Sequence, residues 1–298
     1  MKVGRYEVAS ELGRGGMAVA YLARDPFTKR EVVVKVMMGN LSADPEFTRR
    51  FEQEAQVIAG LEHPFVVPVY DFGYHEHEPY IVMRYMTGGS VEGLLHQHTT
   101  LEMSAIAPII ERMGEALDAI HAKGIVHRDL KPANILIDSN GDTFLADFGL
   151  VKIVGSSGKL SGRFMLGTPA YMAPEQVYGQ SEITLRADVY ALGVMLYEML
   201  TGRPPYLHTD IPKLLMMHVT EPIPRITEAR PDVSPEIEAL IMKAMAKDPK
   251  DRHTSAGEFA NALLGVSRGI PSRRARRRLT GDQMDSMLDA LDEDKSSN

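Results

Sequence analysis

The 298-residue sequence contains no cysteine, so disulfide bonds, thiol catalysis and cysteine-ligated zinc sites are excluded. The N-terminal stretch MKVGRYEVASELG lacks the apolar core of a secretory signal, so none is expected in it. The longest apolar-looking stretch, residues 191–200, contains a glutamate and is far too short to span a membrane. These absences suit a reducing compartment. We expect a soluble, cytoplasmic chain, or the cytoplasmic part of a membrane-anchored protein.

An excess of positive charge is also absent. The sequence carries 33 Lys and Arg against 40 Asp and Glu, which gives a formal net charge of −7 at pH 7. The tail from Val266 has seven basic and six acidic residues, so the acidic excess belongs to the residues before it. An acidic body argues against nucleic-acid binding, which requires cations that neutralise phosphates.

The hydrophobic pattern divides the chain into three parts. Residues 1–86 show mainly strand patterns, interrupted by helical spacing over residues 43–63. Residues 87–265 are mainly helical in pattern and are punctuated by Gly/Pro clusters. The tail, residues 266–298, combines a basic block (SRRARRR, 272–278) with a short amphipathic helical pattern. We therefore expect the α+β class: a small antiparallel sheet with one helix, a larger mainly helical part and a tail.

A glycine-rich stretch follows the first strand pattern and contains Gly13, Gly15 and Gly16. Alanine stands at position 18, where a phosphate-binding loop of the form G-x-G-x-x-G has its last glycine. Taken alone, the stretch predicts a phosphate cradle no better than a plain hairpin turn.

Four further motifs follow the glycine-rich stretch along the chain. They are VVVK ending at Lys35, HRDLKPAN (127–134), DFG (147–149) and APE (173–175). In this order and spacing they form the protein-kinase signature. The chain resembles bacterial serine/threonine protein kinases of the eukaryotic-like family, over residues 1 to about 265. The likeness is strongest in LGRGGMA, HRDLKPANILI and GTPAYMAPEQ.

This resemblance implies the bilobal protein-kinase fold and a serine/threonine kinase that binds ATP and Mg²⁺ between its lobes. The small lobe would comprise residues 1–86 and the large lobe residues 87–265. The implied reaction transfers the γ-phosphoryl group to Ser or Thr hydroxyls of protein substrates. Such a transfer needs positioning and neutralisation of spread negative charge rather than covalent help from the protein.

The resemblance also assigns the charged groups. Lys35 would bind the α- and β-phosphates, with Glu54 as its partner. Glu52 lies in the same helical pattern but fits a solvated acidic face better. The remaining catalytic and metal-binding assignments follow the motifs: Asp129 to accept or orient the substrate proton, Lys131 as the mark of serine/threonine kinases, and Asn134 and Asp147 to hold Mg²⁺.

The nucleotide would contact eleven residues, namely Leu12, Gly13, Gly15, Gly16, Ala20, Val33, Lys35, Met83, Arg84, Met86 and Ser90. Ala20 and Val33 reverse the Val and Ala that the family usually has, so we expect an adenine pocket of conserved volume with a shifted roof. The family contacts at Arg84 and Met86 use backbone atoms. Ser90 and Ala133 replace glutamates of kinases that prefer basic substrates, so a strong preference for arginine is not expected.

Three residues are expected to support the large lobe rather than to act on substrate. Glu175 and Arg252 resemble the family's buried ion pair, and Asp188 should hold the backbone of the catalytic loop. Loss of one partner of such a pair would leave a buried charge uncompensated.

Regulation is expected at the loop between DFG and APE. The resemblance assigns Arg128 to a phosphate on this loop, which offers Ser156, Ser157 and Ser161, with Thr168 behind them. We expect autophosphorylation among these serines. The alternative is an unmodified loop.

The other expectations concern partners. The block at residues 273–278 is a solvated linker, a segment attracted to anionic lipid beside an anchor outside this sequence, or, through RRLT, an autophosphorylation site. Arg5 and Asp71 fall where the family has the ion pair of a homodimer of small lobes.

Two rival functions remain for the kinase signature. One is a pseudokinase that acts as a binding or scaffolding module. Such a protein usually lacks the motif lysine or one of the two motif aspartates, whereas Lys35, Asp129 and Asp147 are all present here. The other is a tyrosine or small-molecule kinase, which Lys131 and GTPAYMAPE disfavour.

Overall fold

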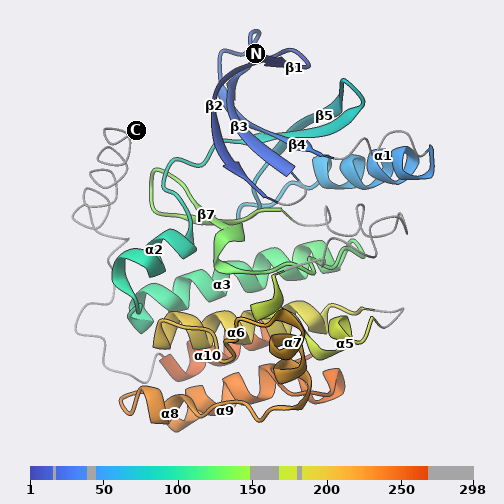
Figure 1. Cartoon of the computed structure of the whole chain (residues 1–298). Helices are drawn as coiled ribbons and strands as arrows, with labels where there is room; N and C mark the ends of the chain where they lie inside the picture. The colour runs from blue at the N-terminus through green and yellow to red at the C-terminus, as the bar shows by residue number, and fades with distance from the viewer. Residues whose placement is uncertain (16–17, 39–44, 148–167, 180–182, 268–298) are drawn as a thin grey trace. The chain divides into compact units, whose positions relative to one another are not determined.

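The chain folds into two compact units: among the described residues, the first comprises Met1–Tyr85 and the second begins at Met86. The structure is a computed structural model, whose elements are labelled in Figure 1. It describes residues 1–15, 18–38, 45–147, 168–179 and 183–267. Among these residues, no helix is long and apolar enough to cross a membrane.

The described part of the first unit contains one antiparallel sheet of six strands in the order β1-β2-β3-β4-β6-β5 (Figure 1). Its strands are β1 (Lys2–Val3), β2 (Tyr6–Arg14), β3 (Ala18–Arg24), β4 (Glu31–Met37), β5 (Val69–His75) and β6 (Glu78–Arg84). Neighbouring strands in the sequence pair directly, except that β4 pairs with β6 because α1 intervenes.

The β-branched run of β4 explains how the sheet acquires two distinct faces. Val32, Val34 and Val36 are buried in a core cluster with Tyr6 and Tyr80, among others. The alternate side chains therefore point to the opposite face, because successive residues of a strand face opposite ways.

Helix α1 (Pro45–Ala59) packs on the sheet through its apolar face. Phe51 is fully buried and makes edge-to-face contacts with Phe72 and Tyr74 of β5, at centroid distances of 6.1 and 5.5 Å. Ala55 and Ile58 are also buried, at the i+4 and i+7 positions from Phe51. The helix predicted from this spacing is confirmed.

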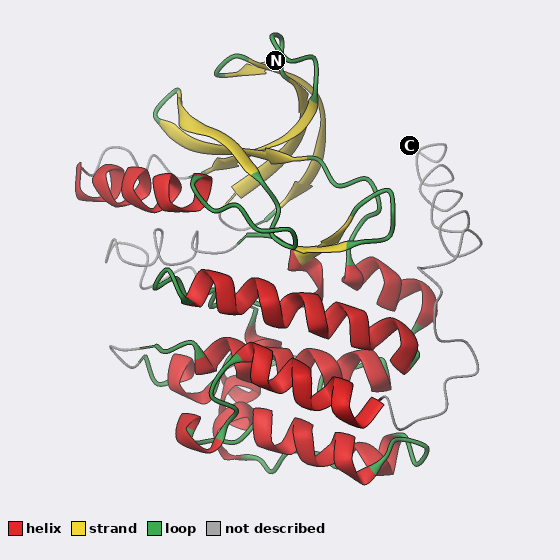
Figure 2. Cartoon of the chain, turned by 180° about the vertical axis from the view of Figure 1, so that it is seen from behind, coloured by secondary structure: helices red, strands yellow, loops and turns green. Residues whose placement is uncertain are grey.

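The described part of the second unit is mainly helical (Figure 2). Its elements are α2 (Val91–His98), α3 (Met103–His121), η2 (Pro132–Asn134), β7 (Ile135–Ile137), β8 (Thr143–Leu145), η3 (Pro169–Tyr171), α5 (Pro174–Val177), α6 (Arg186–Thr201), α7 (Ile211–Thr220), α8 (Ile226–Ala229), α9 (Pro235–Ala244), η4 (Pro249–Asp251) and α10 (Ala256–Ser267). Helix α6 is buried on all sides and is contacted by α3, α9 and α10. A sheet with one helix and a mainly helical part confirm the predicted fold class.

Helices α3 and α10 pack directly against each other, and Asp118 of α3 caps the start of α10. Its carboxylate accepts hydrogen bonds from the backbone N–H groups of Ala256 and Gly257, both at 3.1 Å, and from the Ser255 hydroxyl at 3.0 Å. A carboxylate at a helix N-terminus satisfies free N–H donors and complements the helix dipole. A Cβ at Gly257 would collide with this carboxylate, so the cap requires glycine there.

Gly257→Ala is accordingly expected to destabilise the helical unit by about 1–3 kcal/mol, because the new methyl group displaces the Asp118 carboxylate. Gly265→Ala in the same helix is the matched control, since a Cβ there meets nothing within 4 Å. We expect the control to change stability by less than about 1 kcal/mol, in the stabilising direction. Urea unfolding followed by circular dichroism measures both, and equal midpoints would contradict the role of Gly257.

Candidate active site

The glycine-rich stretch forms the hairpin between β2 and β3. The Gly15 amide donates to the Ala18 carbonyl at 2.9 Å. A Cβ at Gly13 would meet nothing within 4 Å, and a Cβ at Gly15 would meet only that carbonyl, at 3.8 Å. Neither residue has a positive φ, and Gly16 lies outside the described residues. Gly13 lies within β2, paired with Ala20, and the packing of the hairpin does not require either of these two glycines.

One face of the sheet brings together residues predicted to contact ATP. Ala20 of β3 pairs with Lys35 of β4, and Val33 of β4 pairs with Met83 of β6. Val33 and Lys35 are two residues apart, so these four side chains share the face opposite the valine core. Only Met83 among them is buried, at 6% exposure. Leu12, by contrast, is 45% exposed on β2.

The two candidate acidic partners differ in exposure on α1. Glu54 is half-buried, whereas Glu52 is exposed. This difference favours Glu54 over Glu52 as the residue that faces the sheet.

The residues predicted as backbone contacts to the base lie at the end of the first unit and the start of the second. The Arg84 amide donates to the Pro68 carbonyl at 3.0 Å, and Met86 is 6% exposed. Ser90 has a role that the sequence analysis missed. It caps α2 by accepting a hydrogen bond from the Gly93 amide at 3.2 Å, a role that a serine before a helical pattern could have indicated.

In the second unit, a hydrogen-bonded cluster surrounds Asp129. Its carboxylate accepts a hydrogen bond from the Thr168 amide at 2.9 Å and pairs with the Lys131 ammonium at 3.0 Å. Lys131 also donates to the Thr168 hydroxyl at 2.7 Å, and the Asn134 amide group donates to the Asp129 carbonyl at 2.7 Å. The structure thus brings four of the sequence-predicted residues together, although Thr168 lies 39 residues from Asp129.

Asp188 of α6 holds the backbone at the start of the catalytic loop (residues 127–134), as predicted. Its two carboxylate oxygens accept the amides of His127 and Arg128 at 2.8 and 2.9 Å, and His121 adds a third bond at 2.7 Å. Burial raises the pKa of Asp188, but the bonds from His121 and the backbone outweigh this effect and hold the pKa below its usual value. His121 was not predicted, because no local pattern in the sequence connects α3 to α6.

The backbone of Arg128 is in the left-handed region, with φ +69°. This conformation is uncommon for a residue with a long side chain, and hydrogen bonds to both its N–H and its C=O group maintain it here. Asp188 accepts the Arg128 amide, and the Gln176 side chain donates to its carbonyl at 3.0 Å. The Nε of Arg128 is buried and has no hydrogen-bond partner in the part of the chain that the structure describes.

His127 is fully buried and links the catalytic loop to the strand before Asp147. Its Nε2 bonds to the Ala146 carbonyl at 2.9 Å, and its Nδ1 accepts from the Asp129 amide at 3.3 Å. A carbonyl only accepts and an amide only donates, so the imidazole is neutral with its proton on Nε2. Asp147 itself has a positive φ of +61°.

Asn134 and Asp147 fit a hard divalent cation by the chemistry of their donors. Asn134 is 5% exposed, and its Nδ2 donates to Asp129, which leaves the side-chain carbonyl oxygen as an available acceptor. An amide oxygen and a carboxylate are ligands that Mg²⁺ takes, with water and phosphate oxygens completing its shell. The described residues contain no cluster of three or more His, Asp or Glu able to hold a metal without such help.

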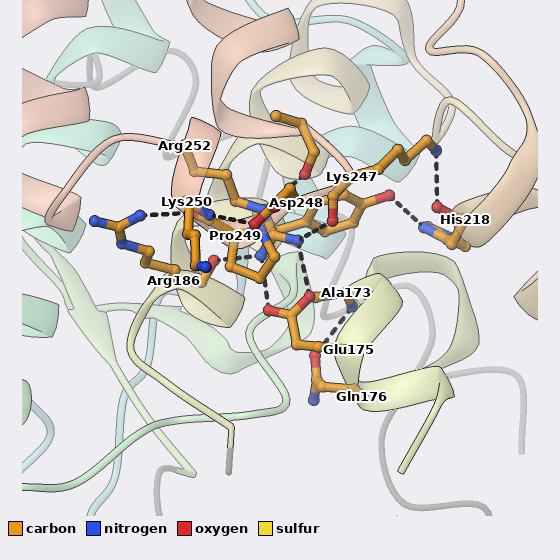
Figure 3. Close-up of polar contacts among 12 residues, drawn as sticks. Ala173, Glu175, Gln176, Arg186, His218, Lys247, Asp248, Pro249, Lys250 and Arg252 are labelled. Carbon is orange, nitrogen blue, oxygen red and sulfur yellow. Dashed lines mark hydrogen bonds and ion pairs between the residues drawn. The ribbon is translucent and has the colours of Figure 1, made fainter. Parts of the chain in front are cut away.

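The predicted pair of Glu175 and Arg252 forms a bidentate ion pair at 2.7 and 2.8 Å (Figure 3). The two side chains are 3% and 0% exposed. The arginine also donates to the carbonyls of Ala246 and Arg186, both at 2.8 Å, and its guanidinium lies 4.9 Å from the ring centre of Tyr190. The structural role expected for this pair is confirmed.

The pair assigned to a homodimer is made within one chain. Arg5 and Asp71 are 2.8 Å apart, and Asp71 also accepts the Tyr6 hydroxyl at 2.7 Å. Asp25 is a further partner of Arg5, at 3.6 Å. The two residues therefore need no second copy of the chain to be paired, and the dimer remains a prediction.

Several other predicted sites lie outside the described residues. They are Ser156, Ser157 and Ser161, together with the basic block at 273–278 and the amphipathic pattern after it.

Comparison with known proteins shows the class that this fold and site belong to. The family model described as protein kinase domain matches residues 6–264. The chain belongs to the protein kinase domain family, which confirms the resemblance found in the sequence.

Its relatives include bacterial serine/threonine-protein kinases. The chain is 38% identical to serine/threonine-protein kinase PknB of Mycolicibacterium smegmatis, over 98% of this chain and 47% of that protein. It is 40% identical to a probable serine/threonine-protein kinase of Streptomyces coelicolor, over 90% of this chain and 41% of that one. The chain thus spans somewhat less than half the length of these curated relatives.

Solved structures show the same fold. A crystal structure of the PknI kinase domain of Mycobacterium tuberculosis superposes with a TM-score of 0.72 at 29% identity. The match covers 90% of this chain and 97% of that domain.

Removing one partner of the buried ion pair should destabilise the helical unit strongly. We expect Arg252→Met to cost about 3–5 kcal/mol, because Glu175 is left as a buried, uncompensated charge. The double replacement Glu175→Leu with Arg252→Met should be more stable than this single variant, since no charge remains buried.

The control for the ion pair is Asp142→Asn. Asp142 pairs with Arg112 at 2.6 Å but is 43% exposed, so its loss should cost less than about 1 kcal/mol. Chemical denaturation measures all three variants. A double variant less stable than Arg252→Met would contradict the uncompensated-charge explanation.

Proposed function

We propose that the chain is a serine/threonine protein kinase that transfers the γ-phosphoryl group of Mg-ATP to Ser or Thr hydroxyls of proteins. Membership of the kinase family and the names of the relatives support this function. The observation that carries it is the cluster in which Lys131 bonds both the Asp129 carboxylate and the Thr168 hydroxyl. Because Mg-ATP is abundant in the cytoplasm, that compartment is the proposed location.

At Asp129, the proposed step needs an oxygen that can accept the proton of the substrate hydroxyl. A carboxylate has about four lone-pair sites, and here the Thr168 amide, Lys131 and Asn134 use three of them. One acceptor site is therefore left for the incoming alcohol. The Lys131 ammonium, 3.0 Å from the same carboxylate, adds positive charge where the phosphoryl group would pass.

Mg²⁺, when bound, would neutralise charge on the phosphates, and Asn134 and Asp147 are the proposed ligands. Lys35 would bind the α- and β-phosphates, with Glu54 orienting it. The glycines at 13 and 15 leave the hairpin backbone open, so that its N–H groups can approach the phosphates.

The adenine contacts are proposed from the sheet face described above. Ala20, Val33 and Met83 supply apolar surface there, and the backbone of Arg84 and Met86 supplies the polar contacts to the base. The short alanine at position 20, opposite Lys35, and the larger Val33 on the neighbouring strand support the proposal of an adenine pocket with a shifted roof.

We further propose that the loop containing Ser156, Ser157 and Ser161 is autophosphorylated and that Arg128 binds the phosphate. The buried Nε of Arg128, which has no partner among the described residues, supports this role. A buried guanidinium donor without an acceptor costs free energy, and a phosphate oxygen would satisfy it.

The proposed activity is tested with Asp129→Asn and Asp147→Asn. With Mg-ATP and myelin basic protein as acceptor, we expect wild-type transfer to serine and threonine, and a loss of about 100-fold or more in kcat in each variant. Asp142→Asn, the same change at a partly exposed site, should retain wild-type activity. Nucleotide binding without transfer in the wild type would identify a pseudokinase, and phosphotyrosine as the product would exclude the proposed class.

Autophosphorylation is tested by intact mass and peptide mapping of dephosphorylated protein incubated with Mg-ATP. We expect added phosphate on the peptide that contains the three serines, and none on it in a variant with all three changed to alanine. Unmodified wild-type peptide after full turnover of another acceptor would show that the loop is not a substrate.

A further inference from the structure

A buried histidine outside the kinase motifs lies within the helical unit, on α7. The side chain of His218 is fully buried, and its Nδ1 shares a hydrogen bond of 2.9 Å with the Tyr190 hydroxyl of α6. The ring of Tyr206 packs edge-on against it, at a centroid distance of 4.9 Å. Burial, together with the charge of Lys247, lowers the pKa of His218 to about 4, so the imidazole is neutral at pH 7.

The C-terminal end of α7 is fixed by two side chains from elsewhere in the unit. Lys247 donates to the His218 carbonyl at 2.7 Å, which satisfies one of the carbonyls that a helix end leaves free (Figure 3). The Tyr206 hydroxyl bonds the carbonyls of Glu221 and Pro222 just after the helix, at 3.0 and 3.1 Å. These contacts restrict the axial position of α7 and therefore the position of the His218 ring.

Helix α7 packs directly against η3, the short helix of Pro169–Tyr171. The backbone of Ala170, within η3, is a weak hydrogen-bond partner of the His218 ring. This contact raises the pKa of His218, but the effect of burial is larger. The Nε2 of His218 is buried and makes no hydrogen bond of good geometry to any described residue. Burying this polar nitrogen next to η3 without a good hydrogen bond costs desolvation free energy.

The segment above the histidine borders the proposed catalytic carboxylate. Thr168, just before η3, bonds Asp129 and Lys131. A hollow at this place is lined by Asp129, Thr168 and Tyr171, among others. A protein acceptor whose hydroxyl reaches Asp129 must lay its neighbouring residues against this segment.

A leucine or methionine of similar volume would fill the space of His218 without burying two ring nitrogens. The histidine therefore does more than fill volume. We propose that His218, held by Tyr190, is a positioning residue for residues 168–171 and thereby sets how the protein acceptor binds. This inference rests on the proposed kinase function.

The test compares His218→Leu, His218→Asn and Tyr190→Phe in the full chain. His218→Leu removes both ring nitrogens. His218→Asn keeps a polar group near the position of Nδ1, and Tyr190→Phe deletes only the partner hydroxyl. With myelin basic protein as acceptor, we expect His218→Leu and Tyr190→Phe to raise the KM for the acceptor about fivefold or more. The KM for ATP should stay within twofold, and His218→Asn should recover most of the loss.

Ile241→Val in α9 is the control for loss of stability alone, because Ile241 is 1% exposed and has no polar contact to lose. It should lower the unfolding midpoint but leave both KM values unchanged. Equal changes in the two KM values, or an unchanged acceptor KM in His218→Leu and Tyr190→Phe, would overturn the inference.

Hydrogen exchange keeps the inference testable if the wild-type chain transfers no phosphate, an outcome that would refute the proposed function by itself. The Tyr171 and Met172 amides are hydrogen-bonded within the segment, to Thr168 and Pro169. We expect His218→Leu to speed their exchange about tenfold and to leave exchange in residues 127–134 unchanged. Unchanged exchange at Tyr171 and Met172 would show that His218 does not position the segment.

Discussion

The arrangement of the candidate site depends on the buried carboxylate of Asp188. It accepts two successive backbone amides of the catalytic loop and a histidine from α3, and these bonds keep it ionised despite complete burial. A buried carboxylate remains ionised only if several donors bond to it, and these bonds hold the donor groups in one arrangement. Together with the Gln176 side chain, which donates to the Arg128 carbonyl, this carboxylate holds the left-handed backbone of Arg128, the residue next to Asp129.

Two other buried polar arrangements of the helical unit, the pair of Glu175 with Arg252 and the ring of His218, differ in their charge. The ion pair of Glu175 and Arg252 is fully buried and bidentate, so its value lies in the penalty for separating the partners. His218 is buried as a neutral ring, because burial and the nearby charge of Lys247 lower its pKa to about 4. The ion pair anchors α5, which contains Glu175, whereas His218 lies on α7, which packs against η3.

Glycine serves two physically different purposes in this chain. At Gly257 the protein's own carboxylate occupies the space of a side chain, so the residue is required for packing. Among the described residues, nothing lies within 4 Å of a Cβ placed on Gly13, and a Cβ placed on Gly15 would meet only the Ala18 carbonyl, at 3.8 Å, so this space is open; neither backbone conformation requires glycine. Packing among the described residues does not account for the latter two glycines, which is why they belong with the proposed function and not with the fold.

The sequence by itself determined the fold class, the family and the order of the motifs, because strand alternation, helical spacing and motif residues are all local in the chain. Lys131, Asn134 and Asp129 are a few residues apart, and Glu175, Arg252 and Asp188 were found through the family pattern. The sequence did not indicate that His121 completes the shell of Asp188, that Arg5 and Asp71 pair within one chain, or that Lys247 fixes the end of α7. Only the tertiary structure decided these contacts, because each joins residues 29 to 67 positions apart whose pairing depends on how helices and strands pack, and no local periodicity encodes it.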